Sequence, residues 1–283
     1  MILLRTTQGP MLRQHGEIFP IDGWSWLDLI NRDDLPALLS KLVSGGTIHG
    51  TADFVSESIL PPIDDRQELW AAGVTYMRSK TARMEEASAS TGGGGGSDFY
   101  DKVYHADRPE LFFKATPHRV AGHHQAMHLR SDSKWIVPEP ELTLVITRNG
   151  NIIGYTVGND LSCRDIEGEN PLYLPQAKTF DRCAALGPGV YISEKPLAPT
   201  TAIKLEITRA GKAVFTGATS IDQIKKPLPT LVEYLFRDNS FPHGCLLMTG
   251  TGIVPPNDFS LQMGDTVRIS IDSIGTLVNM MET

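Results

Sequence analysis

Apolar and polar residues alternate most clearly between residues 138 and 160. Residues 141–147 read ELTLVIT, with leucine or isoleucine at every second position, which is the period of a β-strand. Asn149-Gly150 follows, and Asn-Gly is a strong short-range signal for a hairpin. A second strand-like run, IIGYTVGND, ends the segment. The pattern therefore predicts two antiparallel strands joined by a two-residue loop at Asn149-Gly150.

This register brings three carboxylates together. Glu139 lies directly opposite Asp160, and Glu141 lies two residues along on the same face. Like charges opposite each other destabilise a strand pair, and a divalent cation removes that repulsion. Oxygen ligands without Cys or His suit a hard ion such as Mg²⁺, Mn²⁺ or Ca²⁺. The alternatives are a solvated strand end and a β-bulge that shifts Asp160.

The first part of the chain predicts a small N-terminal α/β domain over residues 1–64. Short strand-like pieces lie at Ile2–Thr6 and Gly16–Pro20. Leucines at helical spacing then predict an amphipathic helix from Ser25 or Leu27 to Leu42. Gly45-Gly46 is its expected stop.

The rest of the chain, residues 65–283, predicts a larger β-rich domain that begins after the proline-containing segment 60–65. One clear helix is expected at Pro229–Arg237, with Thr230 as its candidate cap. The strand-like runs beyond Pro109 are Leu111–Ala115, Leu142–Thr147, Ile152–Val157, Val190–Ile192, Ala202–Thr208, Ala213–Thr219, Cys245–Thr249, Thr266–Ile271 and Thr276–Met280. The predicted class is therefore mixed and β-rich (α+β), with a C-terminal sandwich or roll.

Residues 77–107 differ from both units. They are charged and small, and they contain five consecutive glycines, Gly92–Gly96. Such a run has no fixed backbone preference and offers no side chains for packing. We expect a mobile segment that serves as a lid over a site, with a short helix at Ser79–Ser88; a plain surface loop is the alternative.

Composition excludes several classes of protein. The net charge of −7 argues against nucleic acid or an anionic membrane as the main partner. No apolar run is long enough to span a bilayer, and the apolar start is too short for a signal peptide. Cys163, Cys183 and Cys245 lack CxxC spacing, so a reduced, cytoplasmic setting is expected.

Motifs along the chain identify a family. They read RPELFFKATP, PEPEL, GYTVGNDLSCRDIE, ENPLYLPQAKTFD, TGTGIVP and DSIGTLVN, and in this order they resemble the fumarylacetoacetate hydrolase superfamily over residues 65–283. The resemblance implies a β-roll with a small N-terminal domain, usually a homodimer or homotetramer. It also implies Mg²⁺ that chelates a 2-oxo acid substrate, with the metal triad at Glu139, Glu141 and Asp160.

One departure from the family narrows the expected reaction. Hydrolases of the family that cleave C–C bonds carry N-Y-x-x-H, and here Ser79 stands at the histidine position. The chain is most similar to the branch that dehydrates 2-keto-3-deoxy-D-arabinonate to 2,5-dioxopentanoate in pentose catabolism. The alternatives are a C–C hydrolase or decarboxylase of a 2,4-dioxo acid, such as an acylpyruvate, and a non-catalytic Ca²⁺- or sugar-acid-binding module.

Such a dehydratase needs an acid and a base beside the metal. Lys178 is the first candidate, because a nearby divalent cation lowers the pKa of a lysine; simple pairing with the carboxylates is the alternative. Glu110 is the second candidate, as acid or base, although a glutamate before an apolar strand is often merely exposed. The expected substrate-binding residues are Thr75, Tyr76, Gly250 and Thr251, and the last two otherwise read as an ordinary turn.

Overall fold

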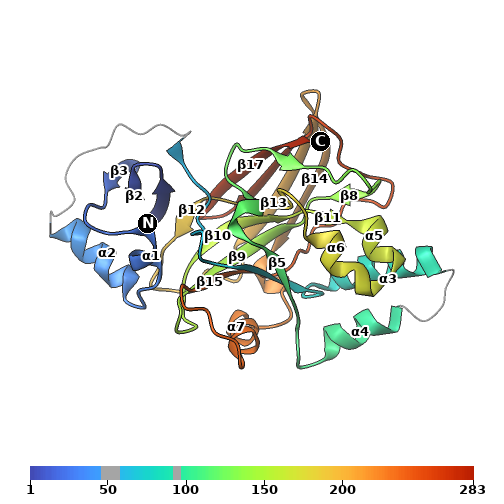
Figure 1. The fold of residues 1–283 in the computed structure, drawn as a ribbon, viewed down its shortest axis with the longest axis horizontal. Helices are drawn as coiled ribbons and strands as arrows, with labels where there is room; N and C mark the ends of the chain where they lie inside the picture. Colours follow the sequence, from blue (N-terminus) through green and yellow to red (C-terminus); the bar gives the residue numbers. More distant parts are fainter. Residues whose placement is uncertain (46–57, 92–96) are drawn as a thin grey trace.

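A ten-stranded mixed sheet joins the N-terminal strands to the larger unit (Figure 1). The computed structural model describes residues 1–45, 58–91 and 97–283. The strand order is β3-β2-β1-β12-β10-β9-β15-β4-β5, with β6 beside β12. These strands are β1 (Ile2–Thr6), β2 (Gly9–Gln14), β3 (Glu17–Pro20), β4 (Leu69–Gly73), β5 (Glu110–Ala115), β6 (Val120–Ala121), β9 (Pro140–Ile146), β10 (Ile152–Asp160), β12 (Ala184–Tyr191) and β15 (Cys245–Met248).

A second sheet of five strands, in the order β14-β13-β16-β17-β7, packs on the first. In β13, buried Ile203 and Leu205 alternate with exposed Lys204 and Glu206, and the buried pair joins Leu144 of β9 in one apolar core. The remaining strands are β7 (Met127–His128), β8 (Ile136–Val137), β11 (Ser162–Cys163), β13 (Ala202–Arg209), β14 (Lys212–Ser220), β16 (Thr266–Ile271) and β17 (Gly275–Glu282). The predicted β-rich α+β class is confirmed.

The strands predicted beyond Pro109 are present, most with ends shifted by one to three residues. The exception is β12, which starts at Ala184 rather than at the predicted Val190. Gly187-Pro188 lies inside this strand, and the dipeptide reads locally as a turn. Pairing with β10 on one side and β1 on the other overrides that local signal.

The predicted single N-terminal helix is wrong, because two helices stand in its place. Helix α1 (Trp26–Ile30) begins at Ser25, whose hydroxyl accepts the Asp28 N–H in a capping box, and Asn31 ends it. Helix α2 (Leu35–Ser44) then starts with a proline in its first turn and ends at Gly45, as expected. Strand β2 between β1 and β3 was missed; the domain division at residue 64 stays a prediction.

The β9–β10 hairpin has the predicted pairing where it matters for the carboxylates. Glu139 and Asp160 exchange backbone hydrogen bonds of 3.2 and 3.0 Å, so they face each other directly. The loop, however, is longer than predicted. Thr147 N–H donates to Asn151 O at 2.9 Å, which leaves residues 148–150 as a three-residue loop with Gly150 at φ +81°.

A β-bulge between Ile152 and Gly154 compensates for the extra loop residue. The loop is held by the Thr147 hydroxyl, which accepts the N–H groups of Asn149 and Asn151 and donates to Asp33 at 2.7 Å. Loop and bulge shift the register in opposite senses. The predicted alignment of the carboxylates therefore survives an incorrect loop.

Four helices gather at the end of the molecule away from α1 and α2 (Figure 1). They are α3 (Met77–Thr91), α4 (Ser97–His105), α5 (Arg164–Glu169) and α6 (Leu174–Lys178). Helix α3 packs on both α4 and α5, and it is longer than the predicted Ser79–Ser88. The expectation of one clear helix beyond Pro109 is wrong, because α5 and α6 also lie in that part of the chain. Both helices are too short to show a helical period in the sequence. Gly92–Gly96 lie outside the described residues.

Helix α7 (Leu228–Phe236) matches the helix predicted at 229–237 within one residue. Its cap is Pro227 rather than Thr230, because the helix starts earlier and Thr230 falls in its first turn. Short 3-10 helices lie at Pro117–Arg119, Pro171–Tyr173 and Ile221–Gln223.

Two further observations bear on the setting of the protein. Among the described residues, no helix combines the length and apolar character needed to cross a membrane. Cys163, Cys183 and Cys245 are all buried and unpaired, as small apolar side chains in the core.

Candidate active site

Three carboxylates form a cluster at the far end of the β9–β10 hairpin. Glu139 precedes β9, Glu141 lies within it, and Asp160 ends β10. One oxygen from each lies within 4.8 Å of the others, and all three residues are buried, Asp160 completely. Burial of this carboxylate cluster is unfavourable unless cations or hydrogen bonds compensate the charge.

Lys178, the last residue of α6, supplies one of these cations. Its Nζ donates to Glu139 at 2.9 Å, Asp160 at 3.0 Å and Ser162 Oγ at 2.5 Å. Burial favours a lowered pKa for Lys178, but Asp160 and Glu139 outweigh it and the pKa is raised. The neighbouring groups of the protein therefore do not produce the lowered pKa that was expected for Lys178.

Lys114 supplies a second cation that the sequence did not reveal. This fully buried side chain of β5 places its Nζ 2.6 Å from Asp160 Oδ1 and donates to the carbonyl oxygens of Leu161, at 3.1 Å, and Lys178. The ammonium group thus contacts both the third carboxylate of the cluster and the backbone of Lys178. Lys114 follows two phenylalanines in the strand, and nothing in that local pattern indicates an ionic role.

The three carboxylates differ in their partners. Arg164 Nη2 donates to Glu139 at 2.9 Å, and Lys178 and Arg164 together outweigh burial and lower the pKa of Glu139. Glu141 accepts only the Gly250 N–H, at 2.6 Å, and no lysine or arginine of the described chain forms an ion pair with it. Burial, with Asp160 and Glu139 nearby, raises the pKa of Glu141 well above its usual value. A divalent cation bound by the carboxylate cluster would stabilise its charged form.

A narrow cavity opens on the carboxylate cluster. Its lining comes from β4 and the residue after it, from α3 and β5, and from the turn after β15. The residues are Ala72, Gly73, Val74, Ser79, Arg83, Phe112, Glu139, Glu141, Asp160, Arg164, Lys178, Gly250 and Thr251. Arg83 and its partner Glu167 of α5 form a buried ion pair that the sequence did not indicate.

The four residues expected to bind substrate take two positions. Gly250 and Thr251 line the cavity, whereas Thr75 and Tyr76 lie behind its wall. Thr75 Oγ1 donates to Thr249 O at 2.6 Å, and it occupies the space that a Cβ on Gly250 would need. Gly250 also has φ +90°, so both its conformation and its surroundings require glycine. The Thr251 hydroxyl is engaged with the backbone of Ile253 at 3.2 Å.

Glu110, at the start of β5, lies against Gly73 at the edge of the cavity. Its Oε2 is buried without a hydrogen-bond partner among the described residues. Burial raises the pKa of Glu110, and the nearby Arg83 partly opposes this. Glu110 is therefore a carboxyl group that retains its proton at a higher pH than a solvated glutamate does.

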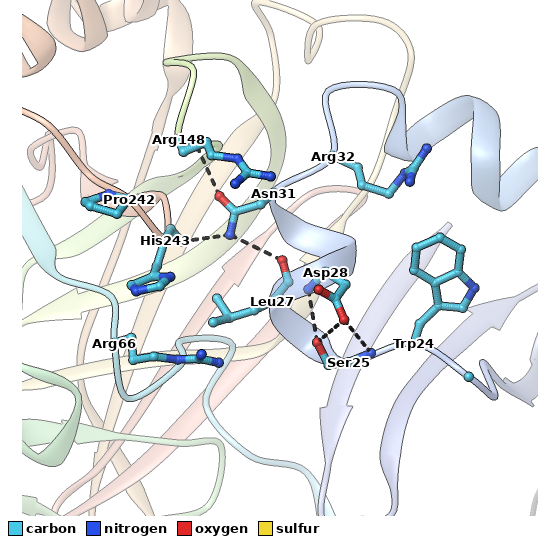
Figure 2. A pocket seen from close by; sticks show the side chains of 11 residues that line it. Trp24, Ser25, Leu27, Asp28, Asn31, Arg32, Arg66, Arg148, Pro242 and His243 are labelled. Carbon is cyan, nitrogen blue, oxygen red and sulfur yellow. Dashed lines mark hydrogen bonds between the residues drawn. The ribbon is translucent and has the colours of Figure 1, made fainter.

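A larger cavity lies beside α1, away from the carboxylate cluster (Figure 2). We call it the arginine cavity; it is lined by Gly23, Trp24, Ser25, Leu27, Asp28, Asn31, Arg32, Arg66, Arg148, Pro242 and His243. Asn31 donates to Leu27 O and His243 O and accepts the Arg148 N–H, so it ties α1 to the rest of the chain. Ser25 and Asp28 cap α1. These polar groups are engaged in holding the fold together.

Several known proteins are similar to this chain in sequence and in fold. The chain is 45% identical over 255 residues to the probable 2-keto-3-deoxyxylonate dehydratase of Haloferax volcanii, covering 90% of this chain and 85% of that protein. It is 44% identical over 221 residues to the 2-dehydro-3-deoxy-D-arabinonate dehydratase of Saccharolobus solfataricus, covering 78% and 73%.

A solved structure of 2-keto-3-deoxy-D-arabinonate dehydratase, complexed with magnesium and 2,5-dioxopentanoate, matches the fold with a TM-score of 0.79. It has 33% identity and covers 99% of this chain and 98% of that chain. Residues 96–282 match the family described as fumarylacetoacetate (FAA) hydrolase C-terminal. The resemblance inferred from the motifs is confirmed, and the chain belongs to the fumarylacetoacetate hydrolase family.

Proposed function

We propose that this protein is a Mg²⁺-dependent dehydratase that converts 2-keto-3-deoxy-D-arabinonate, or a close pentonate relative, to 2,5-dioxopentanoate in pentose catabolism. The observation that carries the proposal is the buried carboxylate cluster, whose member Glu141 has no ion-pair partner in the described chain, with Lys178 beside it. Dehydratases of this substrate class are the relatives at 44 and 45% identity. Ser79, in place of the histidine of the C–C hydrolases, agrees with this reaction.

The balance of charge around the cavity supports an anionic substrate. Among the described residues that line the cavity or pair with its lining, four carboxylates face four cations when Glu110, whose pKa is raised by burial, is left out. The carboxylates are Glu139, Glu141, Asp160 and Glu167, and the cations are Arg83, Lys114, Arg164 and Lys178. A divalent cation adds two positive charges to this set. The negative charge of a 2-oxo acid offsets part of that excess.

Dehydration begins with two proton transfers: one proton leaves C3, and the hydroxyl group at C4 takes a proton and departs as water. The product is an alkene between C3 and C4 that still carries the C5 alcohol. Loss of a C5 proton with protonation at C3 gives the C4–C5 enol, which takes a proton at C4 and loses its hydroxyl proton to become the C5 aldehyde. When bound, Mg²⁺ supplies Lewis-acid polarisation of the keto oxygen. Glu139, Glu141 and Asp160 would hold it. Lys178 in the cavity and Glu110 at its edge are the two groups of the chain that carry the proton transfers.

The activity is tested with 2-keto-3-deoxy-D-arabinonate and Mg²⁺, with the aldehyde product detected through a coupled dehydrogenase. We expect product formation that stops with a chelator and returns with added Mg²⁺; parallel assays with Mn²⁺ and Ca²⁺ identify the preferred ion. Release of pyruvate from an acylpyruvate, with the keto-deoxy acid untouched, would contradict the proposal and favour the hydrolase.

The roles of Lys178 and Glu110 separate in deuterium oxide. Exchange of the C3 hydrogen requires only the base, whereas complete turnover requires both groups. Lys178→Met and Glu110→Gln are each expected to lower kcat about 100- to 10,000-fold, the usual contribution of one proton-transfer group. The variant that also loses C3 exchange lacks the base. Near-native turnover in either variant would exclude that residue from proton transfer.

We further propose a homodimer or homotetramer in the cytoplasm. The five-stranded sheet leaves one face open, with Lys204, Glu206 and Arg268 exposed on it and Met280 of β17 49% exposed. Light scattering measures the assembly, and a monomer at micromolar concentration would contradict it. Unpaired, buried cysteines support the cytoplasmic setting, which fractionation of the source cells tests.

A further inference from the structure

Helix α3 presents one face to the cavity, and that face carries Ser79 and Arg83. The two residues lie four positions apart, so their side chains lie one above the other. Both are buried, at 8% and 5% exposure, whereas Arg78 and Thr81 on other faces of the helix are exposed. The lining of the cavity thus combines the carboxylate cluster and strand residues with Ser79 and Arg83 of α3.

Ser79 offers no base to this cavity. Its hydroxyl accepts the Tyr76 N–H at 3.2 Å and donates to Tyr76 O at 2.8 Å, which caps the start of α3. Arg83, one turn later, carries a guanidinium group that stays protonated and cannot take a proton. This face of α3 can therefore donate hydrogen bonds to a bound molecule but cannot activate water.

Arg83 is held in a fixed orientation by neighbours from two other helices. Glu167 of α5 pairs with its guanidinium, and the ring of Tyr100 on α4 lies 5.8 Å from it. Arg83 lines the cavity, and its guanidinium group, with five N–H donors in a planar fork, is of the kind that can bond more than one partner at once. The same residue lies close enough to Glu110 to influence its titration.

We propose that Arg83 is a specificity-determining residue that donates hydrogen bonds to the C4 and C5 hydroxyl groups of the substrate, opposite the end held by the carboxylate cluster. This inference rests on the proposed function. A guanidinium and a divalent cation repel each other, so the favourable arrangement has the ligand between them. The 2-oxo acid end then lies toward Glu141, and the hydroxylated end lies toward α3 and Glu110.

The test compares two ligands in Arg83→Met, Arg83→Lys and the exposed-arginine control Arg78→Met. One ligand is 2-keto-3-deoxy-D-arabinonate; the other is pyruvate, a 2-oxo acid without the hydroxyl groups, measured as a competitive inhibitor. In Arg83→Met, kcat/KM should fall about 10- to 100-fold, the effect of a lost hydrogen bond to a charged group. The pyruvate inhibition constant and the calorimetric Mg²⁺ affinity should change less than about twofold. Arg83→Lys should lie between, and Arg78→Met should match the wild type.

Other outcomes decide against the inference in distinguishable ways. An unchanged kcat/KM in Arg83→Met would overturn it, and an equal loss of pyruvate inhibition would place Arg83 at the carboxylate end instead. A wild-type enzyme that does not dehydrate the substrate refutes the proposed function itself. If Arg83→Met does not fold, Arg83→Lys still decides, because the inference requires a higher KM for the hydroxylated substrate with unchanged pyruvate inhibition.

Discussion

Two regions of this molecule are rich in charged side chains, and they differ in almost every physical respect. Around the carboxylate cluster, Lys114 and Asp160 are fully buried. In the arginine cavity, Arg32 and its partner Asp34 have side chains 36% and 60% exposed. Ion pairs in water contribute little to stability, whereas a buried charge without its partner is strongly unfavourable. The same residue types therefore matter far more in the first region.

The regions also differ in how their pairs form. Arg32 and Asp34 are two residues apart and can pair without the rest of the fold. Lys178 and Asp160 are 18 positions apart, and Arg164 and Glu139 are 25 apart, so only the folded chain brings them together. The carboxylate cluster is therefore stable only in the folded chain, and the same fold holds Lys178 and Arg164 in fixed positions beside it.

The largest effect is expected from Glu141→Gln, which removes the carboxylate that has no ion-pair partner in the described chain. We expect kcat/KM to fall at least about 10,000-fold, because the metal contributes several kcal/mol to the transition state. Thermal stability without added metal should stay equal or rise, since a neutral amide replaces a buried carboxyl group whose charged form is unfavourable beside Asp160 and Glu139. Mg²⁺ titration calorimetry and thermal unfolding measure both. Full activity after chelation and readdition of Mg²⁺ would remove Glu141 from the metal site.

Lys114→Met should produce the next largest effect, on stability and on metal binding together. The change leaves Asp160 with a single cation and frees the carbonyl oxygen of Lys178. We expect a loss of about 3–5 kcal/mol in the free energy of unfolding, typical of a broken buried pair. Mg²⁺ affinity should fall about 10- to 100-fold, as for other residues that orient metal ligands.

Arg237→Met is the matched control for this change, because Arg237 makes an exposed pair with Glu233 at 2.6 Å. It should leave urea unfolding and Mg²⁺ titration unaltered. Equal behaviour of the Lys114 and Arg237 variants would contradict the contrast between buried and exposed ion pairs.

In the arginine cavity, Asn31→Ala should have a moderate effect on stability alone. Its side chain bonds Leu27 O at 3.2 Å and His243 O at 2.9 Å and accepts the Arg148 N–H at 3.1 Å. Loss of these bonds is expected to lower the free energy of unfolding by about 1–3 kcal/mol. Steady-state kinetics should show an unchanged kcat; a large fall in kcat would connect the arginine cavity to catalysis.

The smallest effect is expected from Arg32→Ala at the edge of the same cavity. Its pair with Asp34 at 2.7 Å is local and exposed, so salt and water screen it. The unfolding midpoint in urea should match the wild type at 150 mM salt. A clear destabilisation that persists at high salt would show that exposure is a poor guide to the importance of an ion pair here.

The parts of the site that the sequence predicted are those set by local pattern. The two-residue period and the Asn-Gly signal located Glu139, Glu141 and Asp160, because a hairpin encodes its own register. The loop was predicted too short, and the bulge near Gly154 restored the alignment. The site residues named from the family resemblance reach the cavity or its wall, and their roles stay predictions.

The parts that the sequence did not predict come from contacts between distant segments. Lys114 lies in an apolar strand, where a lysine usually indicates a solvent-facing position, and only the packing of β5 on β4 and α6 buries it. Arg83 and Glu167 belong to different helices, one of them too short to predict. The break between α1 and α2 was also missed, since the leucine spacing continues across it and only the caps mark the ends.

Gly250 limits how this site can change in evolution or in the laboratory. Its N–H holds Glu141, its φ is +90°, and Thr75 fills the space where a side chain would lie. Any larger residue at position 250 would disturb Glu141, a proposed metal ligand, before it altered the shape of the cavity. New substrate ranges in this scaffold should therefore arise from the α3 side of the cavity, through Ser79 or through Arg83 together with its buried partner Glu167.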